Sequence, residues 1–145
     1  RERTIDIDIV FEIPPQTHDA FIGAVRNLIV RLNVNIEEAS PGDFIPLPAG
    51  YADRHEFIGR FGQLDVFHFD LYSVALSKVG RGREQDYEDV LSLLSQRRIS
   101  WKKLKGYFEE ILPTIATKSL KRDPVQFETH FKALETKWTV AGDNP

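Results

Sequence analysis

The chain of 145 residues contains no cysteine and no methionine, and it has no apolar run that approaches the length of a membrane span. The absence of cysteine excludes disulfides, zinc–thiolate sites and a cysteine nucleophile. No signal-peptide pattern opens the sequence, so a cytoplasmic protein of bacterial type is the default expectation. The chain opens on Arg1, although an initiator methionine is normally removed only before a small residue. We therefore expect that a segment upstream of Arg1 is missing from this sequence.

The residues that are present have the composition of an ordinary folded protein. Hydrophobic residues make up 41% and charged residues 28% of the chain, and the length suits one domain, or one domain with a helical extension. The net charge of −3 hides an asymmetry, because residues 1–70 contain 6 Lys/Arg and 12 Asp/Glu whereas residues 71–145 contain 13 and 10. An acidic half would suit metal binding and a basic half would suit a phosphate-rich partner, but both can equally be solvated surfaces.

Apolar and acidic residues alternate in the segment 4–11, TIDIDIVF. This period predicts a strand with its isoleucines buried on one face and with Asp6 and Asp8 on the other. The two carboxylates would lie about 6.6 Å apart along the strand and would repel each other by about 2.5 kcal/mol at an effective dielectric constant of about 20. A divalent cation between them would remove that repulsion, since hard cations prefer carboxylate oxygens. The alternative is an edge strand whose acidic face is solvated.

A second acid stands in an apolar strand later in the chain. Two strands are predicted over residues 55–61 and 64–69, joined by a tight turn at Gly62-Gln63. Asp65 is the single acid of the second strand, and a buried carboxylate is costly unless it is paired or bound to a metal. We expect Asp65 to be the third member of the site begun by Asp6 and Asp8. The alternative is an aspartate at the strand end, beside the turn.

The remaining pattern predicts an α+β protein in two parts. A helix follows Thr17, a short strand covers residues 33–36, and a Pro- and Gly-rich loop covers residues 37–53. After residue 70 the pattern is helical. Helices are predicted over residues 73–79, 83–96, 101–112, 114–120 and 124–140, with starts at Ser100 and Asp123. Gly80 and Gly82 are expected to interrupt the first of them. The last helix is expected to bury one apolar stripe, formed by Phe127, Phe131, Leu134 and Trp138. We expect a sheet portion over residues 1–72 and a helical portion over residues 73–145 packed on it.

Three stretches together resemble the DNA polymerase beta-like nucleotidyltransferase superfamily. They are RTIDIDIVFE, GQLDVFHFDLYSVALSKVGRGREQDYEDVLSLL and the loop EEASPGDFIPLP. Within the superfamily the chain is most similar to small bacterial proteins of the AbiEii-like and minimal nucleotidyltransferase type, over about residues 1–96. The resemblance implies a small mixed β-sheet of the nucleotidyltransferase type with a flanking helix, followed by a C-terminal helical bundle.

The resemblance also implies a Mg²⁺ (or Mn²⁺) site held by Asp6, Asp8 and Asp65, with Thr4 in a supporting position. Nucleotidyl transfer uses one cation on the triphosphate and another beside the attacking hydroxyl. Asp65 would act as the base, or as the ligand of the metal beside the attacking oxygen. The glycine turn that precedes the two aspartates in the superfamily is missing here. Either the turn belongs to a removed segment or this is a degenerate relative, and the chain as given can lack activity even if a longer protein is an enzyme.

Basic and acidic residues of the helical part complete the site that the resemblance implies. Lys78 matches a helical lysine of the family and is expected to contact phosphate, as is Arg81 on the same face. Asp86 and Asp89 match the acids that follow. Their expected role is a supporting, structural one, by pairing with Lys78, Arg81 or Arg83, rather than a catalytic one.

The expected function is Mg²⁺-dependent transfer of NMP from an NTP to a hydroxyl of RNA, a protein or a small molecule. One setting is the toxin of a toxin–antitoxin pair, with the cognate antitoxin as a partner. The alternative is a non-catalytic module of the same fold that binds a nucleotide or a protein. Residues 97–122 contain 8 Lys/Arg and 2 Asp/Glu, interleaved with aromatic residues. This segment fits an RNA acceptor surface or a solvated helix face equally well.

Overall fold

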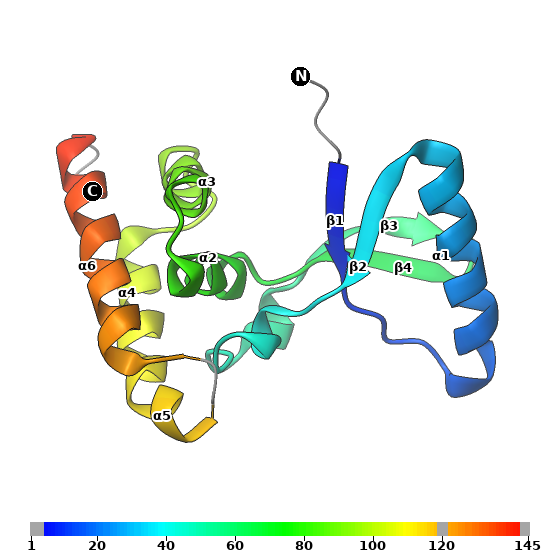
Figure 1. Ribbon diagram of the computed structural model, residues 1–145, viewed down its shortest axis with the longest axis horizontal. Helices are drawn as coiled ribbons and strands as arrows, with labels where there is room; N and C mark the ends of the chain where they lie inside the picture. Colours follow the sequence, from blue (N-terminus) through cyan, green and yellow to red (C-terminus); the bar gives the residue numbers. More distant parts are fainter. Residues whose placement is uncertain (1–4, 119–121, 143–145) are drawn as a thin grey trace. The chain divides into compact units, whose positions relative to one another are not determined.

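The computed structural model describes residues 5–118 and 122–142 (Figure 1). The chain forms two compact units, Arg1–Ser40 and Pro41–Pro145. The boundary expected between residues 72 and 73 falls inside the second unit, and the predicted assignment of domains stays a prediction. No helix within the described ranges is long and apolar enough to cross a membrane.

The first unit is a strand–helix–strand arrangement, as the sequence predicted. Strand β1 (Ile5–Ile9) and strand β2 (Val34–Glu38) pair in parallel, and helix α1 (His18–Leu32) connects them. Helix α1 ends at Asn33, which has φ 51°, a left-handed conformation that asparagine tolerates better than most residues. The expected burial of the isoleucine face is wrong within this unit, because Ile7 is 39% exposed. Two strands and one helix are too few to enclose a core.

The second unit begins with the predicted loop and hairpin. The loop contains short 3-10 turns at Pro41–Asp43 and Tyr51–Arg54, and its Ile45 is only 2% exposed. Strands β3 (Glu56–Phe61) and β4 (Leu64–His68) pair antiparallel across a turn at Gly62, which has φ 66°. The described strands thus form two two-stranded sheets, where one small mixed sheet was expected. The nucleotidyltransferase type of sheet stays a prediction.

The helical part of the chain follows the predicted pattern closely. Its helices are α2 (Leu71–Arg81), α3 (Glu84–Ser95), α4 (Trp101–Ile111), α5 (Ile115–Lys118) and α6 (Pro124–Val140). Gly80 was expected to interrupt the first of them, but it lies buried within α2, where an added Cβ would lie 3.2 Å from Arg122 Nε. Gly82 ends α2 with φ 70°. Residues 119 and 120 of the predicted fourth helix lie outside the described ranges.

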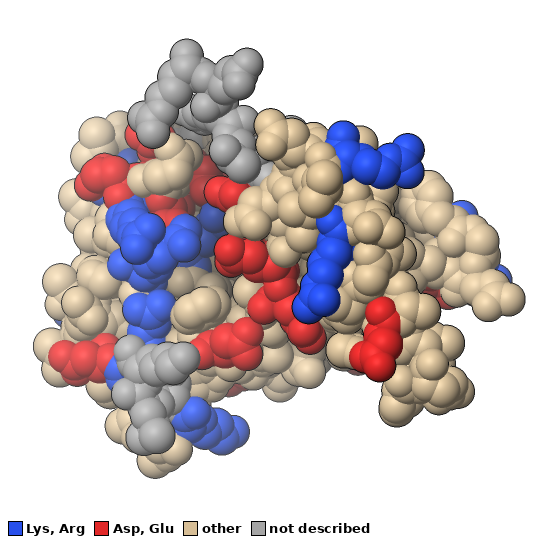
Figure 2. Space-filling model, turned by 45° about the vertical axis from the view of Figure 1, so that its right-hand side comes forward, with Lys and Arg blue, Asp and Glu red and all other residues tan. Residues whose placement is uncertain are grey.

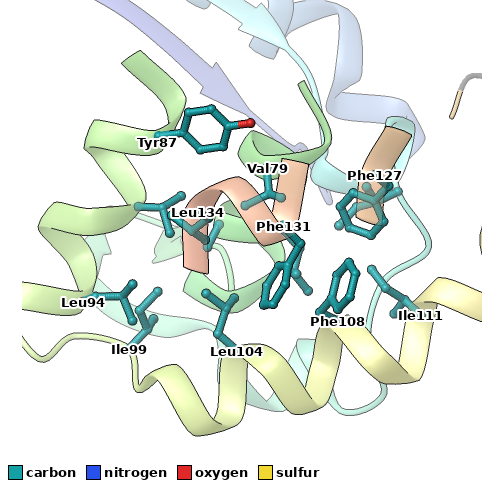
Figure 3. Close-up of a cluster of buried hydrophobic side chains, with 14 of the residues drawn as sticks. Val79, Tyr87, Leu94, Ile99, Leu104, Phe108, Ile111, Phe127, Phe131 and Leu134 are labelled. Atoms are coloured by element: carbon teal, nitrogen blue, oxygen red, sulfur yellow. The ribbon is translucent and has the colours of Figure 1, made fainter. Parts of the chain in front are cut away.

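The hydrophobic core lies among these helices (Figure 3). The predicted stripe on the last helix is confirmed, since Phe127, Phe131, Leu134 and Trp138 are 7% exposed or less. Phe131 stacks on Phe108 of α4 with ring centroids 3.9 Å apart. Each large side chain buried in this way stabilises the fold by about 1.5–3 kcal/mol. The second unit therefore has a closed core of its own.

Candidate functional site

Four oxygen-bearing side chains gather on one face of the β1–β2 sheet. Asp6 and Asp8 alternate along β1, and the parallel register places Asn35 beside Asp6 and Glu37 beside Asp8. Paired residues of a parallel ladder project to the same face. The Asn35 amide donates to Glu37 Oε1 over 3.1 Å. The sequence reading placed Glu37 in a loop, so Asn35 and Glu37 were missed as neighbours of the two aspartates.

Asp6 and Asp8 are exposed, and neither carboxylate has a side-chain hydrogen-bond or ion-pair partner among the described residues. Like charges on one small face disfavour each other in the absence of a counter-charge. Carboxylate and amide oxygens are the donors that hard divalent cations prefer, so the chemistry of this face fits Mg²⁺. The face can therefore attract a cation without first breaking an ion pair at the two aspartates.

Asp65 already has a partner. It lies opposite Arg60 in the β3–β4 register, and the guanidinium binds its carboxylate at two points, over 2.6 and 2.9 Å. This hydrogen bonding from Arg60 holds the pKa of Asp65 below its usual range. The expectation that Asp65 is embedded in a buried strand is wrong, since both side chains are exposed. A two-residue turn at Gly62-Gln63 pairs these positions, so the sequence already contained the signal for this contact.

No three His, Asp or Glu side chains within the described part of either unit lie close enough together to hold a metal ion. Asp6 and Asp8 belong to the first unit and Asp65 to the second. Their convergence on one metal stays a prediction. Thr4, expected to support the site, lies outside the described residues.

The predicted phosphate contacts Lys78 and Arg81, near the end of α2, are both paired with acids of α3. Lys78 Nζ donates to Asp89 over 2.8 Å, and Arg81 binds Asp86 through two bonds of 2.9 and 2.5 Å. The backbone N–H of Arg83 also donates to Asp86, over 3.1 Å. On the face drawn in Figure 2, basic and acidic side chains likewise lie beside one another. The pairing role that the sequence allowed for Asp86 and Asp89 is thus present, while contact with phosphate stays a prediction.

Asp86 and Asp89 of α3 are ionised groups held by their partners. Burial acts to raise the pKa of Asp86, but the hydrogen bonds from Arg81 and from the Arg83 backbone outweigh it, so the pKa is lowered. The balance is the same at Asp89, where bonds from Lys78 and Gln85 outweigh burial and lower the pKa. Both pairs join α2 to α3 through charge-assisted bonds.

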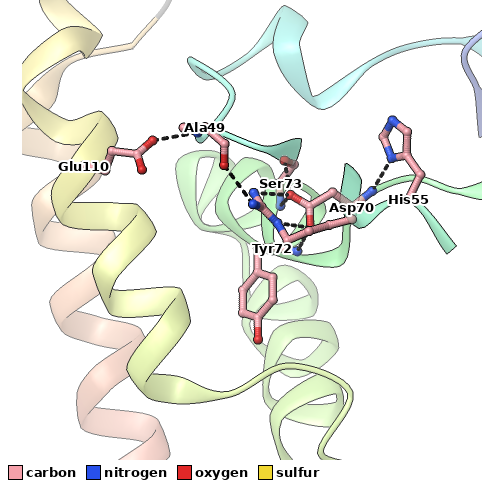
Figure 4. A network of polar contacts seen from close by, with 7 residues as sticks. Ala49, His55, Asp70, Tyr72, Ser73 and Glu110 are labelled. Atoms are coloured by element: carbon pink, nitrogen blue, oxygen red, sulfur yellow. Dashed lines mark hydrogen bonds and ion pairs between the residues drawn. The ribbon is translucent and has the colours of Figure 1, made fainter. Parts of the chain in front are cut away.

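A buried carboxylate that the sequence reading did not single out joins the hairpin to the helices (Figure 4). Asp70 is 1% exposed and caps α2 by accepting from the backbone N–H groups of Tyr72 and Ser73. Arg54 donates to both of its oxygens, each over 3.1 Å, and the Ser73 hydroxyl donates over 2.7 Å. The backbone N–H of Asp70 donates to His55 Nδ1 over 2.9 Å. An aspartate directly before a helix was the available signal.

The loop before the hairpin is bonded into the same network (Figure 4). Arg54 also donates to the Ala49 carbonyl over 2.8 Å, and its guanidinium lies 4.3 Å from the ring centre of Tyr107 on α4. The Ala49 N–H donates to Glu110 over 2.7 Å. The loop is thereby held against α2 and α4, and the network has a structural role.

The chain belongs to a nucleotidyltransferase family. The family model that matches residues 1–139 is described as "Nucleotidyltransferase of unknown function (DUF6036)". This confirms the class of protein that the resemblance implied, whereas the AbiEii-like and DNA polymerase beta-like likeness stays a prediction. Neither the comparison with curated proteins nor the comparison with solved structures found a match.

Proposed function

We propose that this protein transfers a nucleoside monophosphate from an NTP to a hydroxyl acceptor, with Mg²⁺ (or Mn²⁺) held by Asp6 and Asp8. One observation carries the proposal: a member of a nucleotidyltransferase family presents two exposed carboxylates without side-chain partners among its described residues on one strand face. Mg²⁺ is usually bound through one or two protein carboxylates, with waters and substrate phosphates completing its shell. Two aspartates are therefore enough protein ligands for one Mg²⁺ ion.

The other residues of the sheet face assist the two aspartates in this proposal. The Asn35 amide holds the Glu37 carboxylate in place, and Glu37 adds negative charge beside Asp8. When bound, the cation would neutralise charge on the triphosphate and so favour attack by the hydroxyl. Negative charge on this face attracts the cation more strongly at low salt, because exposed charges are screened by salt.

Asp65 is proposed as the third acid, and its role depends on Arg60. While Arg60 is bound, the lowered pKa keeps Asp65 anionic and makes it a weak base. Service as a ligand or base requires that Arg60 exchange its contact for another anion, such as a substrate phosphate. Lys78 and Arg81 are proposed as further phosphate contacts, which they can reach only by sharing or leaving Asp89 and Asp86.

The test is transfer of label from α-labelled NTPs to components of a cell extract in the presence of Mg²⁺. Asp6→Asn and Asp8→Asn each remove one charge without changing side-chain size, and each is expected to abolish labelling. Glu12→Gln is the matched control, because Glu12 is an exposed acid of the same unit outside β1. Circular dichroism establishes that the variants fold. Labelling that persists unchanged in the double variant Asp6→Asn/Asp8→Asn overturns the proposal.

Asp65→Asn and Arg60→Ala separate the proposed roles of this pair in the same assay. If Asp65 is a ligand or base, Asp65→Asn lowers labelling strongly, whereas Arg60→Ala leaves the carboxylate in place and lowers the Mg²⁺ concentration needed for half-maximal labelling. Equal labelling by the Asp65→Asn variant and the unchanged protein removes Asp65 from the proposed site.

A non-catalytic module that binds a nucleotide or a protein is the second candidate. The observation that favours it is the pairing of Asp65 with Arg60 and of Lys78 with Asp89, which occupies groups that catalysis would need for metal and phosphate. Such a module would bind an NTP in equilibrium dialysis and transfer no label to any acceptor. The proposed biological settings, including a toxin with its antitoxin and an RNA, protein or small-molecule acceptor, apply only if label is transferred.

A further inference from the structure

A cavity of about 560 Å³ opens at the start of α4, and all the residues that line it belong to the second unit. Ligand pockets of proteins commonly have volumes of about 300–1,000 Å³. Its lining combines cationic and aromatic side chains, among them Arg97, Arg98, Lys102, Lys103, Trp101 and Trp138. This combination is the one that suits an anion carrying a planar ring.

One side chain of the lining, Trp138, has a buried hydrogen-bond donor without an acceptor in the described part of the chain. Trp138 is 7% exposed, and its indole Nε1–H has no hydrogen-bond partner among the described residues. Leaving a buried donor unpaired costs about 1–3 kcal/mol, and buried tryptophan N–H groups usually find an acceptor. The nitrogen itself lies below the surface, so what Trp138 contributes to the lining is its indole ring.

Helix α4 adds further donors at the same place. It has 11 residues, and the Ser100 side chain caps it by accepting from the Lys103 N–H over 3.2 Å. The first N–H groups of a helix lack intrahelical acceptors, and the aligned peptide dipoles place about half a positive charge at this end. Trp101 and Lys102, the first two residues of α4, both line the cavity. The helix start therefore reinforces the positive potential of the lining.

The basic side chains are only partly neutralised. Arg98 pairs with Glu56 over 3.2 Å, but Arg97, Lys102 and Lys103 have no acidic partner in the described part of the chain. Arg97 also has φ 57°, a left-handed conformation that glycine would adopt without strain. An arginine at this position is less favourable for the backbone than a glycine, so a glycine here would relieve strain.

We propose that this cavity binds the phosphate group of a nucleotide, with the nucleotide base against the indole surface of the lining. The nucleotide can be a free mononucleotide or one unit of an RNA strand, since both present the same phosphate and ring. Stacking of a base on an aromatic side chain contributes about 1–3 kcal/mol per base, and the cationic side chains supply the phosphate contacts. This inference goes beyond the proposed transfer reaction, because binding here needs neither Mg²⁺ nor turnover.

The two tryptophans are the only ones in the chain and both line the cavity, so intrinsic fluorescence reports directly on its occupancy. The protein is titrated in EDTA with AMP, inorganic phosphate, adenosine and a short 5′-phosphorylated single-stranded RNA. We expect saturable quenching by AMP, by the RNA or by both, and a much weaker response to adenosine. Binding by AMP as tight as by the RNA identifies a free nucleotide as the source, and binding by the RNA alone identifies a strand.

Arg97→Gly is the decisive variant, because it removes the charge and also relieves the backbone strain. It is expected to melt at a higher temperature than the unchanged protein and yet to bind about tenfold more weakly, the loss of one charge-assisted contact. Lys132→Gln, an exposed lysine of α6 away from the lining, is the matched control and should bind normally.

Three outcomes overturn the inference. They are the absence of a fluorescence response to any of the phosphates, adenosine binding as tightly as AMP, and undiminished binding by the Arg97→Gly variant. Because no NTP or divalent metal is present, each of them is distinguishable from a failure of the label-transfer experiment.

Discussion

Replacement of Asp70 by alanine tests the network that fixes the hairpin and the loop to the helices. The substitution removes the cap of α2, both bonds from Arg54 and the bond from the Ser73 hydroxyl at once. Asp70 is 1% exposed and Ser73 is fully buried, so solvent does not replace these bonds without rearrangement.

The expected cost follows from the separate losses. A lost N-cap costs about 0.5–2 kcal/mol, and leaving a buried donor unsatisfied costs about 1–3 kcal/mol. Removing one member of a buried ion pair costs about 3–5 kcal/mol in total. Arg54 retains the Ala49 carbonyl and the face of Tyr107, which favours the low end, about 3 kcal/mol. That is a large fraction of the 5–15 kcal/mol typical of a folded domain.

The measurement is urea denaturation followed by circular dichroism, with Asp123→Ala as the matched control. Asp123 caps α6 through one bond to the Val125 N–H, over 3.0 Å, but it is exposed and has no arginine partner in the described structure. With a denaturant slope of about 1–3 kcal/mol per molar urea, Asp70→Ala should lower the midpoint by about 1–3 M and Asp123→Ala by distinctly less. Equal midpoints for the two variants would refute the reasoning, because the buried network would then add nothing to an ordinary cap.

Two further outcomes follow from the end of α2 and the start of α3. Gly82→Ala should destabilise the protein by about 2 kcal/mol or more, because the new Cβ would be attached to a left-handed backbone and would overlap the His130 ring. Gly106→Ala, in open space within α4, should instead stabilise the protein by about 0.5–1 kcal/mol. Thermal melts of the two variants compare these effects. The pKa of Asp86 is lowered in the fold, so its contribution to stability is present above its ordinary pKa of about 4 and is lost as the pH falls through the lowered value. The difference in unfolding free energy between the unchanged protein and Asp86→Asn should therefore be largest near neutral pH and shrink in acid. A difference that does not depend on pH would contradict the conclusion that Asp86 is ionised in the fold.

Local patterns predicted the helices and strands because their signals lie within a few neighbouring residues. Ser100 accepts from an N–H three residues on, and Asp123 precedes a proline at the first helical position. The apolar stripe of α6 repeats every three or four residues and is buried as expected. These features need no knowledge of the rest of the fold.

The same local patterns could not predict contacts between residues that are far apart in the sequence. The partner of Asp70 is Arg54, sixteen residues earlier, and the two meet only when the loop folds back on α2. The burial of Asp65 was misjudged because an apolar strand was assumed to be covered, whereas Phe57 and Phe67 of this hairpin are 60% and 51% exposed. Residue type indicates which side chains favour burial, but it does not show how much surface the neighbouring elements can cover.

The pairing of Asp65 with Arg60 is compatible with a catalytic role for this aspartate. An exposed ion pair contributes little to stability, so exchanging one counter-ion for another at Asp65 costs little. A guanidinium matches phosphate geometry as well as it matches a carboxylate. In the proposed reaction, an incoming triphosphate with its cation would offer each partner a new ion of opposite charge, the cation for Asp65 and the phosphate for Arg60. The ion pair would then keep both side chains charged and oriented until substrate replaces each partner. For this reason the Mg²⁺ concentration that the Arg60→Ala variant requires tests the proposed site better than the stability of that variant does.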